Sequence, residues 1–384
     1  MGIYSEYLNK KLSAEELIKE RKAQLKRISQ IRKRDILVFA SDLNKRIPEI
    51  SIGYSDLLPI KDQLANLKGK KLDLIIETPG GSGETAEDIV KSLRNKYDDI
   101  AIIIPGWAKS AGTIIAMSGN EILMEPNSAL GPIDAQLTWQ GKTFSAQALL
   151  DGLDKTKEEV EKTGVLNKAY IPILQGMSLG EIENARNSLS FAKVLVTDWL
   201  KNYKFKDWNN HKTSGKAVTE DEKEARANEI AEKLCDHKFW KTHGRSIKIK
   251  DLEEMRVRIT DYSQDADLYD AITRYSTLLQ MTFVTNIYKV IETVDAQIYR
   301  FVNVGAQPGI NQDIGNIVID FECNHCKHIS KIQANLKNGS ALKNEHIPFP
   351  KDNKYFCPKC HKESDLSDLR REIEIKTKKN IVSN

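Results

Sequence analysis

The chain has 384 residues, a formal net charge of +4 and five cysteines, and it is 40 % hydrophobic and 29 % charged. These values are typical of a folded protein with one large domain plus an appendage, or with two domains. The small net charge does not by itself indicate a nucleic-acid or membrane partner. No apolar run approaches the ~20 residues of a membrane span, and the amino terminus lacks the apolar core of a signal peptide. We therefore expect a cytoplasmic protein, with at most a peripheral contact to a membrane surface.

Residues 1–34 are predicted to form a basic, amphipathic helical arm. Ser13 and Glu16 fit a capping box at its start. Ten residues of Lys10–Arg34 are Lys or Arg, and the apolar residues recur at helical spacing. Such a helix packs on its own domain or on a neighbour, and the alternative is contact with an anionic surface.

Residues 35–304 are predicted to form an α/β domain with a mainly parallel sheet, because short apolar runs alternate with amphipathic segments. The expected strands are Asp35–Ala40, Leu72–Ile76, Ile100–Ile104 and Glu121–Met124. The expected helices are Ser55–Leu67, Glu84–Tyr97, Ala111–Ser118, Leu149–Lys162, Leu179–Tyr203, Glu220–Lys233 and Asp265–Val294. A linker is expected at 305–315, followed by a small domain at 316–384.

Two loops of this domain bring complementary chemistry to one place. Thr78–Gly81 and Lys109–Gly112 each follow a strand that is apolar on both faces. A right-handed crossover puts both loops at the carboxyl edge of the sheet, where they line one crevice. Adjacent glycines can expose backbone N–H groups, and Ser110 precedes a helix whose first N–H groups are unpaired. A hydroxyl beside such donors is what acyl transfer requires, although a serine at this position is also a common helix cap.

Three motifs together carry a resemblance to a known family. Thr78–Ser82 (TPGGS), Ala108–Thr113 (AKSAGT) and Ser128–Gln136 (SALGPIDAQ) resemble the Clp protease/crotonase superfamily. Within it, the chain is most similar to the serine dehydrogenase proteinases, relatives of signal peptide peptidase A. The resemblance is strong over residues 70–137 and weaker to about residue 260.

The resemblance implies an ATP-independent serine endopeptidase on a Clp/crotonase-type spiral sheet with surrounding helices. Ser110 is then the nucleophile, and the amide of Ala111 forms the oxyanion hole with that of Gly80 or Gly81. Relatives of this kind assemble into rings or stacked trimers, which implies a homo-oligomer that acts on extended polypeptide segments.

The serine needs a base, and the sequence leaves its identity open. No histidine lies within residues 1–210, which rules out the plain Clp arrangement. A desolvated lysine can act instead, because burial lowers its pKa. The candidates are Lys155, Lys157, Lys162 and Lys168. The similarity of residues 166–186 to the lysine-bearing segment of signal peptide peptidases implies a Ser-Lys dyad with Lys168, and Lys162 is second.

Two further residues are auxiliary candidates. Asp134 lies about where a Clp-type histidine would be, and it could orient a base, line the pocket or cap a turn. His243 lies in a segment that resembles the later part of the serine dehydrogenase proteinases. It could reach the site from afar, because the order of triad residues along a chain is not fixed.

The carboxyl-terminal segment carries a separate metal signal. Cys323, Cys326, Cys357 and Cys360 form two C-x-x-C pairs, which in a reducing compartment indicate a metal and not disulfides. Four thiolates suit tetrahedral Zn²⁺ and leave no open position, so a structural zinc ribbon is predicted. The spacing between the pairs is long, which a hairpin insertion would explain. His325, His328 and His361 could replace one cysteine. The lysine-rich ribbon could dock a protein or bind nucleic acid.

Two rival functions remain open at this point. The first is an acyl-CoA enzyme on the same fold, but crotonases use two oxyanion amides without a serine nucleophile, so the serine argues against it. The second is a catalytically inactive, peptidase-like scaffold that binds nucleic acid or protein through the ribbon and the basic arm.

Overall fold

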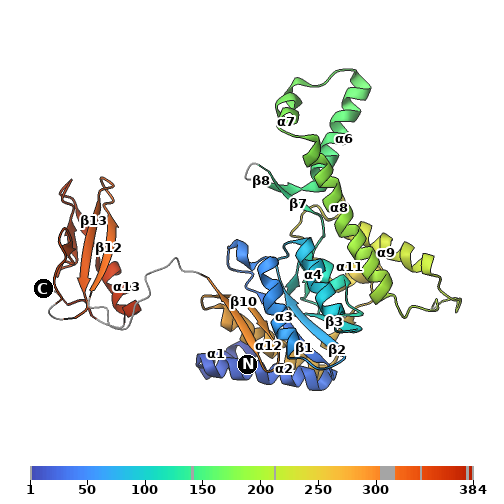
Figure 1. Cartoon of the computed structure of the whole chain (residues 1–384), viewed down its shortest axis with the longest axis horizontal. Coiled ribbons are helices and arrows are strands. Elements are labelled where there is room, and N and C mark those ends of the chain that lie inside the picture. Colours follow the sequence, from blue (N-terminus) through green and yellow to red (C-terminus); the bar gives the residue numbers. More distant parts are fainter. Residues whose placement is uncertain are drawn as a thin grey trace. The chain divides into compact units, whose positions relative to one another are not determined.

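The chain divides into two compact units, Met1–Val302 and Asn303–Asn384 (Figure 1). The computed structural model describes residues 2–139, 142–211, 213–302, 316–337, 340–377 and 380–382. The linker predicted at 305–315 lies outside these residues.

A seven-stranded mixed sheet forms the centre of the first unit, in the order β11-β10-β1-β2-β3-β5-β9. Its strands are β1 Asp35–Ser41, β2 Lys71–Glu77, β3 Asp99–Ile104, β5 Glu121–Met124, β9 Thr260–Asp261, β10 Ile287–Glu292 and β11 Gln297–Phe301. The run from β1 through β9 is parallel, whereas β10 is antiparallel to β1 and β11 is antiparallel to β10.

Both faces of the sheet are covered by helices, so its central strands are apolar on both sides. Leu74 and Ile102 belong to the core on one face, and Ile75 and Ile103 belong to the core on the other. The first core is closed by α3 (Leu57–Ala65), α4 (Gly83–Arg94), α5 (Ala111–Met117), α8 (Leu179–Trp199) and α9 (Glu220–Cys235), and the second by α2 (Ala14–Arg32) and α12 (Ala266–Phe283). Burying such side chains stabilises the fold by about 1.5–3 kcal/mol each. Two-sided burial explains why these strands read as uninterrupted apolar runs.

The helices of the first unit have the following bounds. They are α1 Ile3–Lys10, α2 Ala14–Arg32, α3 Leu57–Ala65, α4 Gly83–Arg94, α5 Ala111–Met117, α6 Ala146–Thr163, α7 Ile171–Gln175, α8 Leu179–Trp199, α9 Glu220–Cys235, α10 His237–Trp240, α11 Ile249–Glu254 and α12 Ala266–Phe283. Short 3-10 turns lie at Pro48–Ile50, Tyr54–Asp56, Lys168–Tyr170 and Tyr262–Gln264, and a π-helical turn extends α8 over Leu200–Lys204.

The predicted helix Asp265–Val294 is wrong beyond Phe283. The chain turns there and returns as β10, whose Ile291 pairs with Phe39 of β1. The apolar residues in Ile287–Glu292 fit both the period of a helix and that of a strand. Strand β1, which lies far away in the sequence, favours the strand because its edge pairs with this segment. Strands β10 and β11 add two antiparallel pairings to a sheet whose other pairings are parallel, so the expected mainly parallel sheet is confirmed.

The predicted amino-terminal arm consists of two helices, because the chain turns at Lys11 with φ 48°. Helix α2 begins at the expected capping box of Ser13 and Glu16 and packs against the sheet and α12. Arg21 is buried and bonds to both carboxylate oxygens of Glu292 at 3.0 Å. The arm is thus fastened to its own domain by a buried ion pair.

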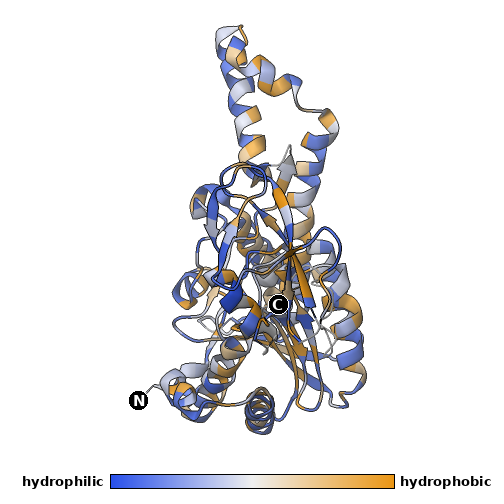
Figure 2. Cartoon of the chain, turned by 90° about the vertical axis from the view of Figure 1, so that its left-hand side faces the viewer, coloured by the Kyte–Doolittle hydropathy of each residue, from blue (hydrophilic) through white to orange (hydrophobic). Residues whose placement is uncertain are grey.

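A second arm projects away from the sheet and consists of a hairpin followed by α6, α7 and the start of α8 (Figure 1). Its hairpin strands are β7 Gln136–Trp139 and β8 Lys142–Ser145, which pair only with each other. Hydrophobic and hydrophilic residues alternate along the arm helices (Figure 2). Val165, Ile173 and Leu179 are all more than half exposed. The sequence pattern did not predict this hairpin.

The second unit is a small β structure with one helix. Its strands are β12 Asn316–Glu322, β13 Ile329–Asn335, β14 Ile347–Pro348, β15 Lys354–Phe356 and β16 Glu363–Asp365, and its helix is α13 Ser367–Thr377. Strands β12 and β13 form an antiparallel hairpin, and β15 pairs with β16. A separate core includes Ile332, Tyr355 and Leu366 together with Cys323 and Cys357.

Candidate active site

Ser110 lies at a sharp turn between the short strand β4 (Trp107–Ala108) and α5, both of which are almost entirely buried except for Trp107. Its backbone has φ 50° and ψ −117°, a conformation that costs about 1–3 kcal/mol for a residue other than glycine. The Ser110 carbonyl accepts the N–H groups of Thr113 and Ile114, but its side chain makes no cap bond to the helix. The alternative role as a helix cap therefore lacks support: Ser110 is half-buried, and its hydroxyl has no hydrogen-bond partner among the described residues.

The glycine loop lies directly against this turn, as the crossover argument predicts. Thr78 donates its N–H to the carbonyl of Trp107 at 2.9 Å, and Lys109 donates to the carbonyl of Thr78 at 3.0 Å. Gly80 has φ +106°, and a Cβ atom there would lie 2.6 Å from the Cβ of Ser110. Only glycine permits this approach.

Two backbone N–H groups beside Ser110 are available to a ligand. The N–H of Gly80 is already donated to the Thr78 hydroxyl at 3.2 Å. Those of Gly81 and Ala111 find no acceptor among the described residues. Since Ala111 is the first residue of α5, its N–H also lies at the positive end of the helix. Of the two glycines, Gly81 is therefore the one whose amide can pair with Ala111 to hold an oxyanion.

Ser110 opens onto a cavity of about 380 Å³. One wall is Gly81 and Ala111, and another is formed by Ile133 and Asp134, which follow the short strand β6 (Ala129–Leu130). The third wall is one face of α8, where the residues recur at helical spacing: Asn184, Asn187, Ser188 and Phe191. A side chain of a substrate can therefore enter this cavity next to the Ser110 hydroxyl.

The carboxylate of Asp134 contacts two histidines that lie far away in the sequence. Its carboxylate is buried, with 1 % of the residue exposed. One oxygen contacts Nδ1 of His243 at 2.5 Å, and the other contacts Nδ1 of His237 at 3.1 Å. Burial alone would raise the Asp134 pKa, but the two histidines outweigh it and hold the pKa below its ordinary value. A carboxylate bound to Nδ1 leaves Nε2 of the imidazole free to accept a proton.

The sequence analysis missed two residues of this region, His237 and Lys109. His237 begins α10, and no spacing connects it with Asp134 in advance. Lys109 immediately precedes Ser110 and is buried, with 8 % exposed. Burial lowers its pKa to about 8, and nearby Lys248 contributes. The signal that could have revealed it is a lysine between two segments that are otherwise apolar or small, in the motif AKSAGT.

The four predicted lysines lie elsewhere in this chain. Lys168 is exposed in the short turn before α7, and Lys162 is 76 % exposed and 3.7 Å from Glu158 on the same helix. Lys155 and Lys157 are exposed on α6. The described structure thus brings Asp134 to the Ser110 cavity and His243 to Asp134, and it places Lys168 and Lys162 on the projecting arm, outside the residues that line that cavity.

A second, apolar groove shares one lining residue, Asn184, with the Ser110 cavity. It has a volume of about 310 Å³ and lies between the β7–β8 hairpin and the helices α7 and α8. Leu137, Phe144, Ile173 and Met177 line it, and Asn184 lines both spaces. In the part of the chain that the structure describes, β7 pairs with no strand other than β8, so its other edge offers unpaired backbone groups. An extended chain could therefore lie along β7 with an apolar side chain in the groove.

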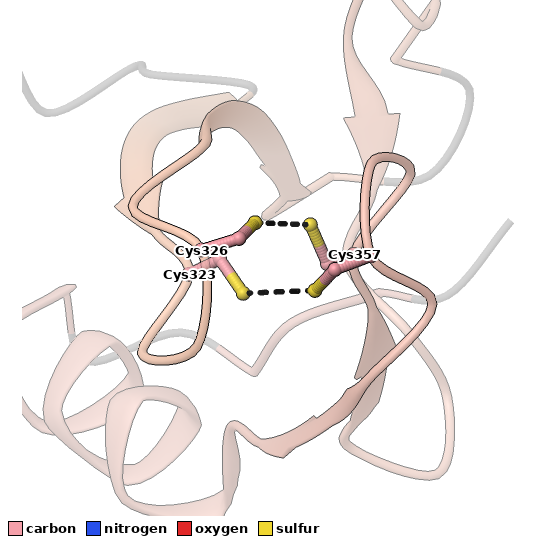
Figure 3. Close-up of side chains that lie close together, drawn as sticks. Cys323, Cys326 and Cys357 are labelled. Atoms are coloured by element: carbon pink, nitrogen blue, oxygen red, sulfur yellow. Dashed lines mark hydrogen bonds between the residues drawn. The ribbon is translucent and has the colours of Figure 1, made fainter.

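The second unit gathers its four cysteines at one point (Figure 3). The sulfur atoms of Cys323, Cys326, Cys357 and Cys360 all lie within 4.8 Å of one another. The Sγ atoms of Cys323 and Cys360 are 3.7 Å apart, and those of Cys326 and Cys357 are 3.6 Å apart. The N–H groups of His325 and Cys326 lower the pKa of Cys323 and so favour its thiolate. These four residues could hold a metal ion.

The two cysteine turns have the same geometry. Lys327 and His361 each follow the second cysteine of a pair with positive φ, at 60° and 57°, and donate to the carbonyl of the first cysteine at 2.9 Å. This repetition is typical of a two-knuckle tetrahedral site. Among the described residues, His325, His328 and His361 do not join the cluster.

Comparisons with known proteins give the following relatives. Residues 4–216 match a family described as ClpP-like SDH-type serine proteinase. Two uncharacterized proteins of Methanocaldococcus jannaschii are 44 % identical over 70 residues and 35 % identical over 89 residues. These matches cover 18 % and 23 % of this chain, and 24 % and 29 % of the relatives. The chain thus matches about a quarter of the length of these relatives.

Two solved structures are also similar, both of variants of a membrane-bound stomatin-specific protease, one in complex with a substrate peptide. They are 13 % and 14 % identical to the chain, with TM-scores of 0.33 and 0.34. Each covers 58 % of this chain, and the chain covers 79 % and 75 % of them. In the part of the chain that is described, none of the helices combines the length and the hydrophobicity needed to cross a bilayer.

Proposed function

Since the chain belongs to the ClpP-like SDH-type serine proteinases, we propose that it is a serine endopeptidase that cleaves peptide bonds through an acyl-enzyme at Ser110. The observation that carries this proposal is the free Ser110 hydroxyl in a strained turn, next to two unpaired amides and open to a cavity. Strain and a free nucleophile argue for activity and against a scaffold that only binds. They also argue against an acyl-CoA enzyme that needs no nucleophile.

The reaction follows from this geometry. The Ser110 oxygen attacks the scissile carbonyl carbon while a base takes the hydroxyl proton. Negative charge develops on the carbonyl oxygen, which accepts the N–H groups of Gly81 and Ala111. The tetrahedral intermediate collapses when the base returns its proton to the leaving amine. Water then attacks the ester with help from the same base, which releases the second product and restores Ser110.

We propose His243, oriented by Asp134, as the base within one chain. Support comes from the 2.5 Å contact to Asp134 and from the place of Asp134 in the wall of the Ser110 cavity. Lys168 is the second candidate, on the resemblance to signal peptide peptidases. It is exposed here, so it could act only if the projecting arm moved or if another chain supplied it.

The substrate is proposed to be an extended polypeptide segment with an apolar side chain. The apolar groove beside β7 is wide enough for one such side chain, and the free edge of β7 can pair with its backbone. ATP-independent cleavage remains our prediction from the family resemblance. A homo-oligomer is also proposed, on the family resemblance and on the exposed apolar residues of the projecting arm.

For the second unit we propose one structural Zn²⁺ held by Cys323, Cys326, Cys357 and Cys360. Thiolates are the ligands that zinc prefers, and four of them close the coordination shell. The metal then stabilises the small core around Tyr355, and no reaction step passes through it. Docking of a protein or of nucleic acid by this ribbon remains a prediction from its lysines.

Labelling with a fluorophosphonate probe tests the proposal, because only an activated serine reacts. The full chain should be labelled once, and Ser110→Ala should lose the label while keeping its fold. His243→Ala should slow labelling by about 10²–10⁴-fold, the range that a general base contributes. Lys168→Ala should react like the parent. Labelling of Ser110→Ala at the parent rate would contradict the role of Ser110 as the nucleophile. If Lys168→Ala were slowed and His243→Ala reacted like the parent, the base would be Lys168 in a Ser-Lys dyad.

A further inference from the structure

Lys109 is a buried cation without a counter-ion. No carboxylate of the described residues forms an ion pair with it, although only 8 % of it is exposed. Its Nζ atom instead donates hydrogen bonds of 3.0 Å to three neutral acceptors, the carbonyls of Leu130 and Arg245 and the hydroxyl of Ser246. An ammonium group has three protons, so all of them are used. Such a group is poorly stabilised compared with a buried ion pair.

The surrounding fold leaves a fitted path for this side chain. A Cβ atom at Gly131 would lie 2.7 Å from Cδ of Lys109, so only glycine leaves room for the lysine there. The ring of Trp107 lies 5.3 Å from Nζ and offers its face to the cation. The Lys109 side chain is thus held in one orientation, with its Nζ atom toward the loop that follows α10.

Two of the three acceptors of Lys109, Arg245 and Ser246, belong to the segment that carries His243. Arg245 and Ser246 lie two and three residues after His243, and Ile247 forms two hydrogen bonds of 3.0 Å with Leu130. Four residues after Leu130, Asp134 binds His243 itself. Lys109 therefore ties the turn of Ser110 to the same loop that Asp134 holds from the other side.

We propose that Lys109 is a positioning residue of the active site, which fixes the loop 242–247, and with it His243, relative to Ser110. This inference rests on the proposed function and on His243 as its base. Lys109 does not act as the base, because its three protons point to Leu130, Arg245 and Ser246 and its Nζ makes no hydrogen bond with Ser110. The residue contributes geometry, and replacing it should slow the reaction without weakening the binding of a ligand.

The test compares Lys109→Met with Lys223→Met in the full chain. Lys223 is also buried, with 6 % exposed, but its Nζ donates to the carbonyl of Lys206 at 3.3 Å and pairs with Glu220 at 3.0 Å, so these partners lie outside the loop 242–247. The maximal rate of fluorophosphonate labelling should fall about 10–100-fold in Lys109→Met, while the probe concentration for half-maximal rate changes less than about 3-fold. Lys223→Met should label like the parent. A parent-like rate in Lys109→Met overturns the inference.

The pH profile provides a readout that a merely structural lysine would not change. Because the pKa of Lys109 is about 8, the parent should label more slowly as the pH rises above 8 and one donor is lost. Lys248 also lowers the pKa of Lys109, and it donates to the carbonyls of Asn127 and Ser128. Lys109→Met should lack the alkaline decline. A decline at the same pH in this variant would overturn the inference.

A double-mutant cycle separates this role from a direct effect on Ser110. In a His243→Ala background, Lys109→Met should slow labelling by less than about 2-fold further, because both changes remove the same contribution. A full 10-fold loss in that background overturns the inference and leaves the proposed function intact. If Ser110→Ala retains the label, both fail together. If Lys109→Met does not fold, Ser246→Ala replaces it, and a parent-like rate in that variant overturns the inference.

Discussion

At the scale of single residues, Glu77 at the end of β2 is a buried carboxyl group directly before the glycine loop. It is buried with 5 % exposed, and Gln280 of α12 donates to one of its carboxylate oxygens at 2.8 Å. The other oxygen has no partner among the described residues. Burial raises the Glu77 pKa to about 7, and Asp42 adds to the rise. The glycine loop that holds Gly81 begins at the next residue, so the loop depends on a carboxyl group that is easily protonated.

This pKa predicts a pH-dependent stability. The pKa of Glu77 is about 7 in the folded chain and about 4.5 in the unfolded chain, so the folded chain binds this proton more tightly. The stability that protonated Glu77 contributes is therefore lost as the pH rises from 4.5 through 7. Glu77→Gln should therefore unfold less readily than the parent at pH 8, by about 1–3 kcal/mol, and like the parent at pH 5. Thermal unfolding of both proteins at the two pH values measures this. An equal gain at pH 5 and pH 8 would contradict it.

At the scale of elements, the contact between the glycine loop and the start of α5 determines the geometry of the oxyanion site. Gly80 and Ser110 approach so closely that one extra methyl group would push the two loops apart. The positive φ values of Gly80 and Gly81 add a backbone penalty for any other residue. The site therefore depends on the packing of two loops more than on any single side chain.

Gly80→Ala is predicted to lower the labelling rate of Ser110 by about 10²–10³-fold, since the donor at Gly81 moves away from the oxyanion. It should also destabilise the fold by about 1–3 kcal/mol. Gly152→Ala is the matched control, because Gly152 lies inside α6 with open space around its Cα. Alanine there should be neutral or stabilise the helix by up to about 1 kcal/mol. If both variants labelled at the parent rate, the glycine loop would have no part in the reaction.

At the scale of the whole molecule, the two units have separate cores and separate chemistry. The cysteine cluster belongs to the core that includes Ile332 and Leu366, whereas Ser110 belongs to the unit Met1–Val302. A metal bound by thiolates stabilises only the unit that supplies them, because the unfolded chain offers no preformed site. The peptidase unit should therefore not need the metal.

Metal analysis of the purified full chain should find one zinc per chain. A strong chelator should unfold the second unit, seen as faster hydrogen exchange after residue 316, while labelling of Ser110 continues. A chain that ends at Asn316 should also be labelled. Less than about half an equivalent of metal, in protein prepared without chelator, would reject the site. Loss of labelling in the shortened chain, with its fold intact, would show that the second unit supports the reaction.

The sequence by itself determined the features that depend on local pattern. The apolar runs at Leu72–Ile76 and Ile100–Ile104 predicted buried parallel strands, and crossover handedness then placed the glycine loop beside Ser110. The motifs indicated the serine proteinase family, which the match over residues 4–216 confirms together with its ClpP-like α/β fold. The two C-x-x-C pairs predicted that the four cysteines would lie together, because each pair places two thiolate ligands close to each other in the sequence.

Only the tertiary structure decided the features that depend on contacts between distant segments. Ile287–Glu292 became a strand because β1 offered it an edge, and Asp134 acquired His237 and His243 from more than 100 residues away. Lys109 is buried because Gly131 and the loop after α10 close over it. In each case the side chain has no fixed neighbour in the unfolded chain, so its protonation, contacts and role arise only when the fold brings its partners together.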